Sequence, residues 1–72
     1  MDSLRDVRKS RGWTLAELGG LAGVDAATIS RIERRRAKPR PETIVRIARA
    51  LGLTVDRVRG MVVTDDELEG VS

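Results

Sequence analysis

The sequence predicts an all-α fold, a compact bundle of five short helices in one domain of 72 residues. Apolar residues recur at helical spacing along most of the chain. Serine, threonine or aspartate precedes four of the five apolar segments, where each can cap the start of a helix. Glycine stands near the end of four segments, where it can terminate a helix.

The first segment opens at Ser3, which is expected to form a capping box with Asp6. Leu4 and Val7 then face inward. Trp13 is the one aromatic residue of the chain. We expect it to make a core or capping contact rather than to stack on a base, because one tryptophan is no stacking platform.

A second capping box, Thr14 with Glu17, is expected to open the next segment. Its inward face consists of Leu15, Leu18 and Ala22. Gly19 removes a side chain where a second helix can cross closely, and Gly23 supplies left-handed backbone at the helix end.

Asp25 is suited to cap the third segment, after a corner filled by Val24. Ile29 and Ile32 face inward at helical spacing. The outward face consists of Ala26, Ala27, Ser30, Arg31 and Arg34. This helix therefore presents a surface that a partner can read.

Pro41 fits the first turn of a fourth helix, where its missing N–H costs nothing. The buried stripe of that helix consists of Ile44, Ile47, Ala48 and Leu51. Gly52 closes it, and Thr54 can cap a short fifth helix that ends near Gly60. Val55 and Val58 face inward from this last helix.

We expect a folded domain over residues 1–60 and an acidic C-terminal tail over residues 61–72. The tail is flexible or contributes to dimer or partner contacts. Disorder is the favoured interpretation, but Thr64 and Glu67 can also cap one more turn, and Met61 to Val63 can form a strand or dimer contact. No calcium-loop spacing accompanies its carboxylates, so no metal site is expected.

Charge is distributed unevenly. The chain carries +3 overall, but all 14 basic residues precede Gly60, so residues 1–60 carry 14 minus 7, or +7. A basic body suggests a polyanionic partner, although solubility alone explains the charge equally well. Arginine outnumbers lysine twelve to two. One explanation of this excess is function, because arginine suits bidentate contacts to phosphate and guanine. The other is the coding bias of a G+C-rich genome, which also favours arginine over lysine.

Several classes of protein are excluded. Cysteine and histidine are absent, which removes disulfides, zinc sites and the usual catalytic bases. Gly19, Gly20 and Gly23 lack the strand and the Lys-Ser/Thr ending of a phosphate loop. No enzyme, cofactor or small-molecule ligand is expected. Because no apolar run exceeds three residues, we expect no export signal and no membrane segment, and a cytoplasmic location.

The stretch from Thr14 to Glu33, TLAELGGLAGVDAATISRIE, resembles the helix-turn-helix of phage lambda and Cro-type repressors. The similarity rests on Gly19, Gly23, the apolar positions around them and the run TISRIE. It continues through KPRPETIVRIARALGLTVDRV and so covers about residues 3 to 60.

This resemblance implies that the third helix enters the major groove of double-stranded DNA and reads bases from its first, second and sixth residues. Arg31 can donate two hydrogen bonds to guanine, and the two alanines offer methyl contact to thymine. The expected base-reading residues are Ala26, Ala27, Thr28, Ser30 and Arg31. Bidentate recognition of adenine needs Asn or Gln, which the chain lacks, so we expect a G·C-containing site.

Phosphate contacts are expected beside the groove, mainly from the five cations in the seven residues 34–40. A solvated charge run is the simpler alternative. The expected phosphate-binding residues are Thr14, Arg8, Arg34, Arg35, Arg36, Lys38 and Arg40. In the family, an arginine of the first helix pairs with a glutamate that ends the third, which implies a partly buried pair of Arg8 and Glu33 rather than two unrelated surface charges.

Two positions depart from the family pattern. Leu15 stands where the family often has a phosphate-binding glutamine, so that contact is expected to be lost. Arg35 stands where glycine is favoured after the third helix. Either the helix runs a turn longer, or Arg35 tolerates strained backbone.

Taken together, the residues and the resemblance predict a sequence-specific transcriptional regulator, a repressor that binds an inverted-repeat operator as a homodimer. An antitoxin or a restriction–modification controller protein of the same fold is an alternative, in which the tail grips a protein partner. A protein-interaction module that does not use the groove face is another.

Overall fold

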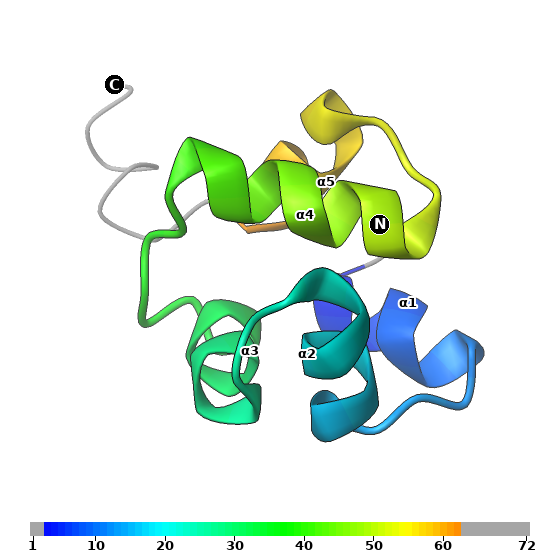
Figure 1. Ribbon diagram of the computed structural model, residues 1–72. Coiled ribbons are helices and arrows are strands. Elements are labelled where there is room, and N and C mark those ends of the chain that lie inside the picture. The colour runs from blue at the N-terminus through cyan, green and yellow to red at the C-terminus, as the bar shows by residue number, and fades with distance from the viewer. Residues whose placement is uncertain (1–2, 63–72) are drawn as a thin grey trace.

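The computed structural model describes residues 3–62. Five helices follow one another along this part of the chain (Figure 1): α1 (Leu4–Ser10), α2 (Leu15–Ala22), α3 (Ala26–Glu33), α4 (Pro41–Leu51) and α5 (Val55–Met61). The all-α, five-helix fold predicted from the sequence is therefore confirmed. In Figure 1, α4 lies across α2 and α3, α5 lies behind α4, and α1 lies to one side.

Both predicted capping boxes form. The Asp6 N–H donates to Ser3 Oγ at 3.1 Å, and the Ser3 N–H donates to Asp6 Oδ2 at 3.2 Å. Thr14 and Glu17 make the same reciprocal contacts, both at 3.1 Å. Each box gives a hydrogen-bond acceptor to one backbone N–H of the first helical turn and to the backbone N–H of the capping residue. These two short helices therefore begin at fixed positions.

The last two helices also begin as predicted, and α4 ends at the predicted glycine. Pro41 is the first residue of α4, whose N-cap, Arg40, makes no side-chain capping bond. Gly52 follows α4 in the left-handed region, with φ of +69°. Thr54 caps α5 by accepting the Arg57 N–H at 3.2 Å.

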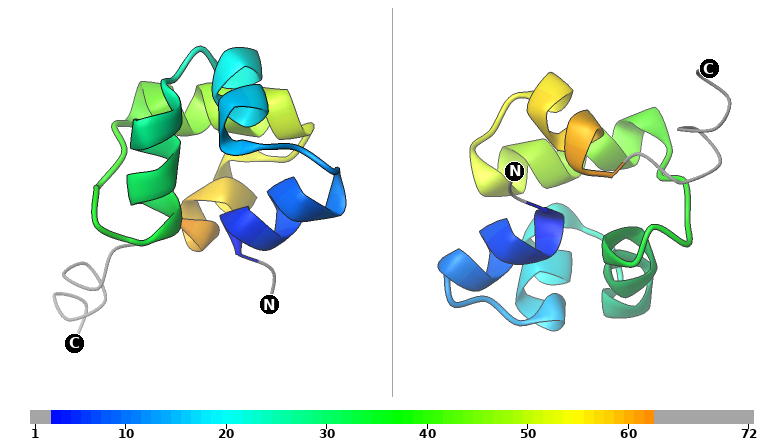
Figure 2. Two further views of the ribbon diagram at one scale, coloured as in Figure 1. Left: turned by 90° about the horizontal axis from the view of Figure 1, so that it is seen from below. Right: turned by 180° about the vertical axis from the view of Figure 1, so that it is seen from behind.

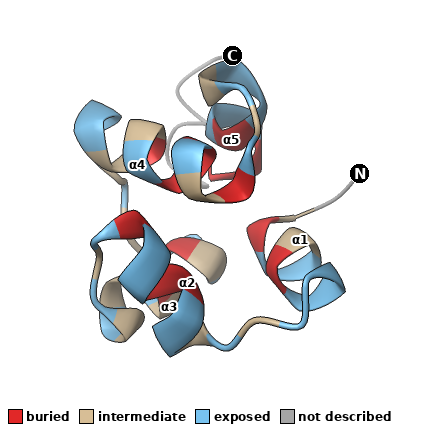
Figure 3. Ribbon diagram, turned by 45° about the vertical axis from the view of Figure 1, so that its right-hand side comes forward, coloured by how far each residue is buried: buried red, intermediate tan, exposed pale blue. Residues whose placement is uncertain are grey.

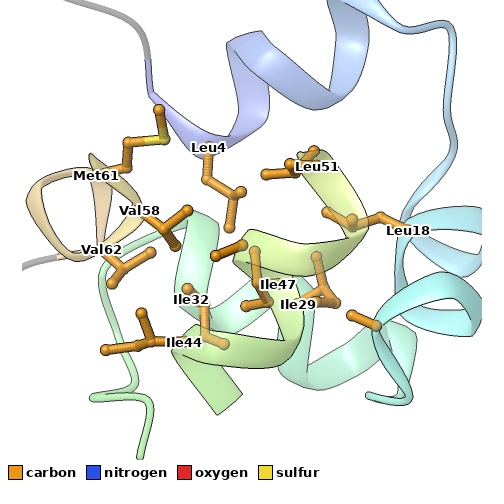
Figure 4. Close-up of a cluster of buried hydrophobic side chains, with 12 residues drawn as sticks. Leu4, Leu18, Ile29, Ile32, Ile44, Ile47, Leu51, Val58, Met61 and Val62 are labelled. Carbon is orange, nitrogen blue, oxygen red and sulfur yellow. The ribbon is translucent and has the colours of Figure 1, made fainter. Parts of the chain in front are cut away.

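Figure 4 shows the buried side chains of all five helices converging on one core. Leu4 reaches it from α1, Leu18 from α2 and Val58 from α5. The largest share comes from α3 and α4, which supply Ile29, Ile32, Ile44, Ile47, Ala48 and Leu51. In Figure 3 these buried faces turn toward one another, and the outer faces of the helices are exposed. Three residues predicted to face inward, Val7, Leu15 and Val55, are half-buried at the edge of the core.

The end of the folded region differs from the sequence prediction. Met61 is the last residue of α5, and both Met61 and Val62 pack in the core with 9% and 3% exposure. At these two positions packing in the core replaces the alternative of a strand, and a dimer contact stays a prediction. The boundary drawn after residue 60 therefore falls inside α5. The predicted Thr64–Glu67 cap and the disorder of the tail lie outside the described residues.

None of the helices between residues 3 and 62 combines the length and the apolar character that a bilayer-spanning helix needs.

Candidate nucleic-acid interface

The turn between α2 and α3 depends on two glycines. Gly23 adopts φ of +71°, the left-handed conformation predicted for it. At Gly19, an added Cβ would lie 2.3 Å from the carbonyl oxygen of Val24. The nearest neighbour of Gly19 is thus the backbone of the turn, and the added Cβ would also lie 3.5 Å from the backbone nitrogen of Ala26, the first residue of α3. Because the Val24 N–H also donates to the Gly19 carbonyl at 2.8 Å, the turn is held directly against α2.

Asp25 starts α3 and also engages Thr28. Its Oδ2 accepts the Thr28 N–H at 3.2 Å, and its Oδ1 accepts the Thr28 hydroxyl at 2.6 Å. The hydrogen bond from the Thr28 side chain is the main reason that the pKa of Asp25 lies below its ordinary value. The Thr28 hydroxyl hydrogen is therefore used within the protein, and its oxygen remains able to accept a hydrogen bond from a base amino group.

The outward face of α3 carries the residues predicted to read bases. Ala27 and Arg31, four residues apart on one face, are exposed, and Arg34 continues that face beyond the helix end. Ala26, Thr28 and Ser30 are half-buried. The structure thus places Ala27 and Arg31 at the most accessible part of the face and the other three closer to the body of the protein.

The predicted pair of Arg8 and Glu33 is present. Arg8 Nε donates to Glu33 Oε2 at 2.6 Å, and Arg8 Nη2 donates to Glu33 Oε1 at 3.1 Å. The side chains are 9% and 6% exposed, so two unrelated surface charges can be ruled out as an interpretation. The bonds to Glu33 raise the pKa of Arg8 and keep the guanidinium charged.

A third acceptor completes the surroundings of Arg8. Its Nη1 donates to the carbonyl oxygen of Trp13 at 2.8 Å, and the Trp13 N–H donates to the Arg8 carbonyl at 3.2 Å. Trp13 itself is half-buried against the core, and the guanidinium carbon of Arg11 lies 5.4 Å from its ring centroid. The predicted core contact of Trp13 is confirmed. All three side-chain nitrogens of Arg8 donate to acceptors within the protein. The predicted contact of Arg8 with phosphate stays a prediction.

An open cavity of about 240 Å³ lies between α1, the start of α2 and the end of α3. Its lining residues are Arg5, Arg8, Leu15, Ser30, Glu33 and Arg34. The arginines at positions 5 and 34 are exposed, so the cavity has a cationic rim suited to an anion. Sequence reasoning missed Arg5. Its position three residues before Arg8, on the same face of α1, is the signal that could have found it.

The backbone after α3 decides between the two alternatives left open for Arg35. The helix ends at Glu33, and Arg35 adopts φ of +59°. The N–H of Arg36 donates to the Arg31 carbonyl at 2.9 Å, and that of Arg35 donates to the Ile32 carbonyl at 3.0 Å. These two bonds form a Schellman termination with arginine at the position that glycine usually fills. The helix does not run a turn longer, and Arg35 adopts the left-handed backbone conformation, which is strained for a residue with a side chain.

The loop from α3 to α4 brings the predicted phosphate-binding cations together. It runs along one edge of the molecule, on the left in Figure 1. Its exposed cations are Arg34, Arg35, Arg36, Lys38 and Arg40. Thr14 is exposed at the start of α2, where its hydroxyl oxygen accepts the Glu17 N–H and its own O–H can donate. The predicted base-reading and phosphate-binding residues are thus arranged around α3.

The comparisons with known proteins agree with this geometry. A family model described as helix-turn-helix matches residues 4–58. The HTH-type transcriptional regulator DdrOP3 of Deinococcus deserti is 33% identical over 70 residues, which cover 96% of this chain and 54% of that protein. The HTH-type transcriptional repressor RghR of Bacillus subtilis is 45% identical over 51 residues, which cover 69% of this chain and 38% of that protein.

An uncharacterised HTH-type transcriptional regulator of Mycobacterium tuberculosis is 33% identical over 64 residues, which cover 89% of this chain and 25% of that protein. The chain therefore spans between a quarter and just over half of these relatives' lengths. No solved structure matches the chain.

Proposed function

The chain belongs to the helix-turn-helix family of lambda repressor and Cro type, whose regulators bind DNA, and we propose that it is a sequence-specific DNA-binding repressor of transcription. It binds an inverted-repeat operator as a homodimer, with half-sites about 10 bp apart. Occupying a promoter and excluding the polymerase is the simplest mechanism for a domain of this size. The protein acts in the cytoplasm, where it meets its operator.

One observation carries the proposal: Ala27 and Arg31 are exposed on the face of α3, and the cationic loop of residues 34–40 adjoins that face. A helix of this width fits the major groove of B-DNA. With α3 in the groove, Arg31 faces the base edges, where its guanidinium can donate to O6 and N7 of a guanine. Ala27, four residues earlier, has only a methyl group to offer.

The phosphates beside the groove are held on two sides. The loop cations after α3 contact one backbone, and their number makes the affinity steeply dependent on salt. The cavity lined by Arg5, Ser30 and Arg34 accepts a second phosphate beside the start of α2. Arg5 and Arg34 there take over the role that a glutamine at the position of Leu15 has in other members of the family. Arg8 and Glu33 hold α3 at the angle that both contacts require.

Selection of bound duplexes from a random pool, at about 0.15 M salt, tests this function in one experiment. The proposal expects an enriched sequence with two symmetric half-sites about 10 bp apart, each containing a G·C pair. Sedimentation of the complex on the selected duplex is expected to give two protein chains per duplex.

The selection, combined with purification of the protein from its own cells, separates the rival functions. Enrichment of a symmetric site together with co-purification of a second, unrelated protein favours an antitoxin or a restriction–modification controller. No duplex retained at any salt concentration contradicts DNA binding and favours a protein-interaction module.

A further inference from the structure

A second cavity, of about 170 Å³, lies on the side of α4 where the chain leaves α5. It is lined by Lys38, Pro39, Pro41, Ile44, Arg59 and Val62. Ile44 and Val62 are only 6% and 3% exposed and form an apolar floor with the two prolines. Arg59 and Lys38 are exposed and form a cationic rim. The lining residues come from the loop before α4, the first turn of α4 and the end of α5, and the right-hand view of Figure 2 shows α5 and α4 lying next to each other.

The sequence that follows Val62 has the complementary pattern. Leu68 is flanked by Glu67 and Glu69, and Asp65 and Asp66 precede them. An apolar side chain between carboxylates matches an apolar floor between cations. Leu68 is six residues beyond Val62, which itself lines the groove, and six residues span at most about 20 Å when extended. The segment is therefore long enough to turn back onto the groove.

We propose that the acidic segment Asp65–Glu69 docks into this groove in the same chain, with Leu68 on the apolar floor and its carboxylates beside Lys38 and Arg59. The docked carboxylates then lie next to the cationic loop of residues 34–40. They compete there with DNA phosphates, so the segment acts as a built-in competitor. Docking is independent of the proposed function, whereas the competition rests on it.

Docking is tested without DNA, by NMR on the complete 72-residue chain. Leu68→Ser removes the apolar contact without changing charge, and Asp65→Asn with Asp66→Asn weakens the ionic contact. Both variants are expected to shift the amide signals of Lys38, Ile44 and Arg59 and to leave those of α2 in place. Val71→Ser, a charge-neutral change just outside the docking segment, is the matched control and is expected to shift none of them.

Three results overturn docking within one chain. The first result is that the amide signals of the groove residues do not respond to either variant. The second is that they respond equally to Val71→Ser. The third result is a dependence of the shifts on protein concentration, which identifies the occupant as the segment of a second copy. Since none of the substituted residues lies in the described core, loss of folding does not confuse these outcomes.

Competition is tested by measuring the Kd for a duplex of random sequence. If about two thirds of the molecules hold the segment in the groove, Leu68→Ser lowers the Kd about threefold, and Val71→Ser leaves it unchanged. Equal Kd values for the wild type and Leu68→Ser overturn the competition even if the NMR signals move. If no variant binds any duplex, the proposed function fails, and the NMR result still decides whether the segment docks.

Discussion

Arg8 and Glu33, which lie 25 residues apart in the sequence, form a two-point ion pair with N–O distances of 2.6 Å and 3.1 Å. The pair joins α1 to the last residue of α3, and a third bond from Arg8 to the Trp13 carbonyl ties it to the connection before α2. Because α3 has only eight residues, this attachment at its end fixes the direction in which its outer face points.

Removing one member of the pair should destabilise the fold strongly. Arg8→Ala leaves the Glu33 carboxylate buried without its partner, and we expect a loss of about 3 kcal/mol in the free energy of unfolding. Urea titrations followed by circular dichroism measure it. Replacing both residues, Arg8→Met with Glu33→Leu, should cost less than the sum of the single changes Arg8→Met and Glu33→Leu, since no charge is left buried alone. Additive losses would show that the two side chains are not coupled.

The two adjacent glycines of α2 should respond oppositely to alanine. At Gly19 the new methyl group meets the Val24 carbonyl, so Gly19→Ala should destabilise the fold by about 2 kcal/mol. At Gly20 a Cβ meets no atom from outside its own stretch of helix backbone within 4 Å, and Gly20→Ala should stabilise the helix by about 0.5 kcal/mol. Thermal unfolding of both variants checks the contrast. A Gly19→Ala protein as stable as the wild type would disprove the close contact at the turn.

Arg35→Gly should stabilise the protein, because glycine adopts φ of +59° without the strain that a side chain imposes. We expect a gain of about 1 kcal/mol in the free energy of unfolding. Arg34→Gly is the matched control: Arg34 has φ of −85°, so the same loss of charge should destabilise by about 0.5 kcal/mol. Equal effects at the two positions would contradict the left-handed conformation of Arg35.

Acid should weaken the start of α3 through Asp25. Its folded-state pKa is lowered from 3.8, mainly by the hydrogen bond from Thr28, so the unfolded chain binds the proton more tightly. The stability that this carboxylate contributes is complete above its unfolded-state pKa, near 3.8, and is lost as the pH falls from there through the lower folded-state value.

Asparagine also caps helices but does not titrate, so Asp25→Asn should flatten the decline of stability below pH 3.8. Denaturant titrations of both proteins at a series of acidic pH values compare the slopes. Parallel curves would show that Asp25 is not responsible.

Local sequence rules predicted most of this fold because its helices begin with local contacts. The Ser3–Asp6 and Thr14–Glu17 boxes join residues three apart, and the left-handed glycines need no information from the rest of the chain. The pair of Arg8 and Glu33 is long-range, and periodicity alone does not predict it. The family resemblance supplied that pair.

Other features depend on packing that the sequence does not display. Met61 and Val62 are buried because α5 ends against the core. The residue types at these positions are equally compatible with an exposed strand. Arg35 is also compatible with a longer helix, and only the observed backbone decides against it, through the positive φ of Arg35 and the bonds from Arg35 to Ile32 and from Arg36 to Arg31. The spacing of Arg5 from Arg8 places both on one face of α1, but only the cavity that α1 lines together with the end of α3 brings Arg5 to Arg34.

We propose above all that Arg31 reads a base from the exposed face of α3. The most direct test of this proposal is the Kd of the wild type, Arg31→Ala and Arg36→Ala on the selected duplex and on random duplex over a range of salt concentrations. Arg31→Ala should cost about 1–3 kcal/mol on the selected duplex and relax the preference at one base pair. Arg36→Ala should weaken binding to both duplexes alike and reduce the salt slope by about one. An equal loss of affinity on both duplexes for Arg31→Ala would contradict its role as a base reader.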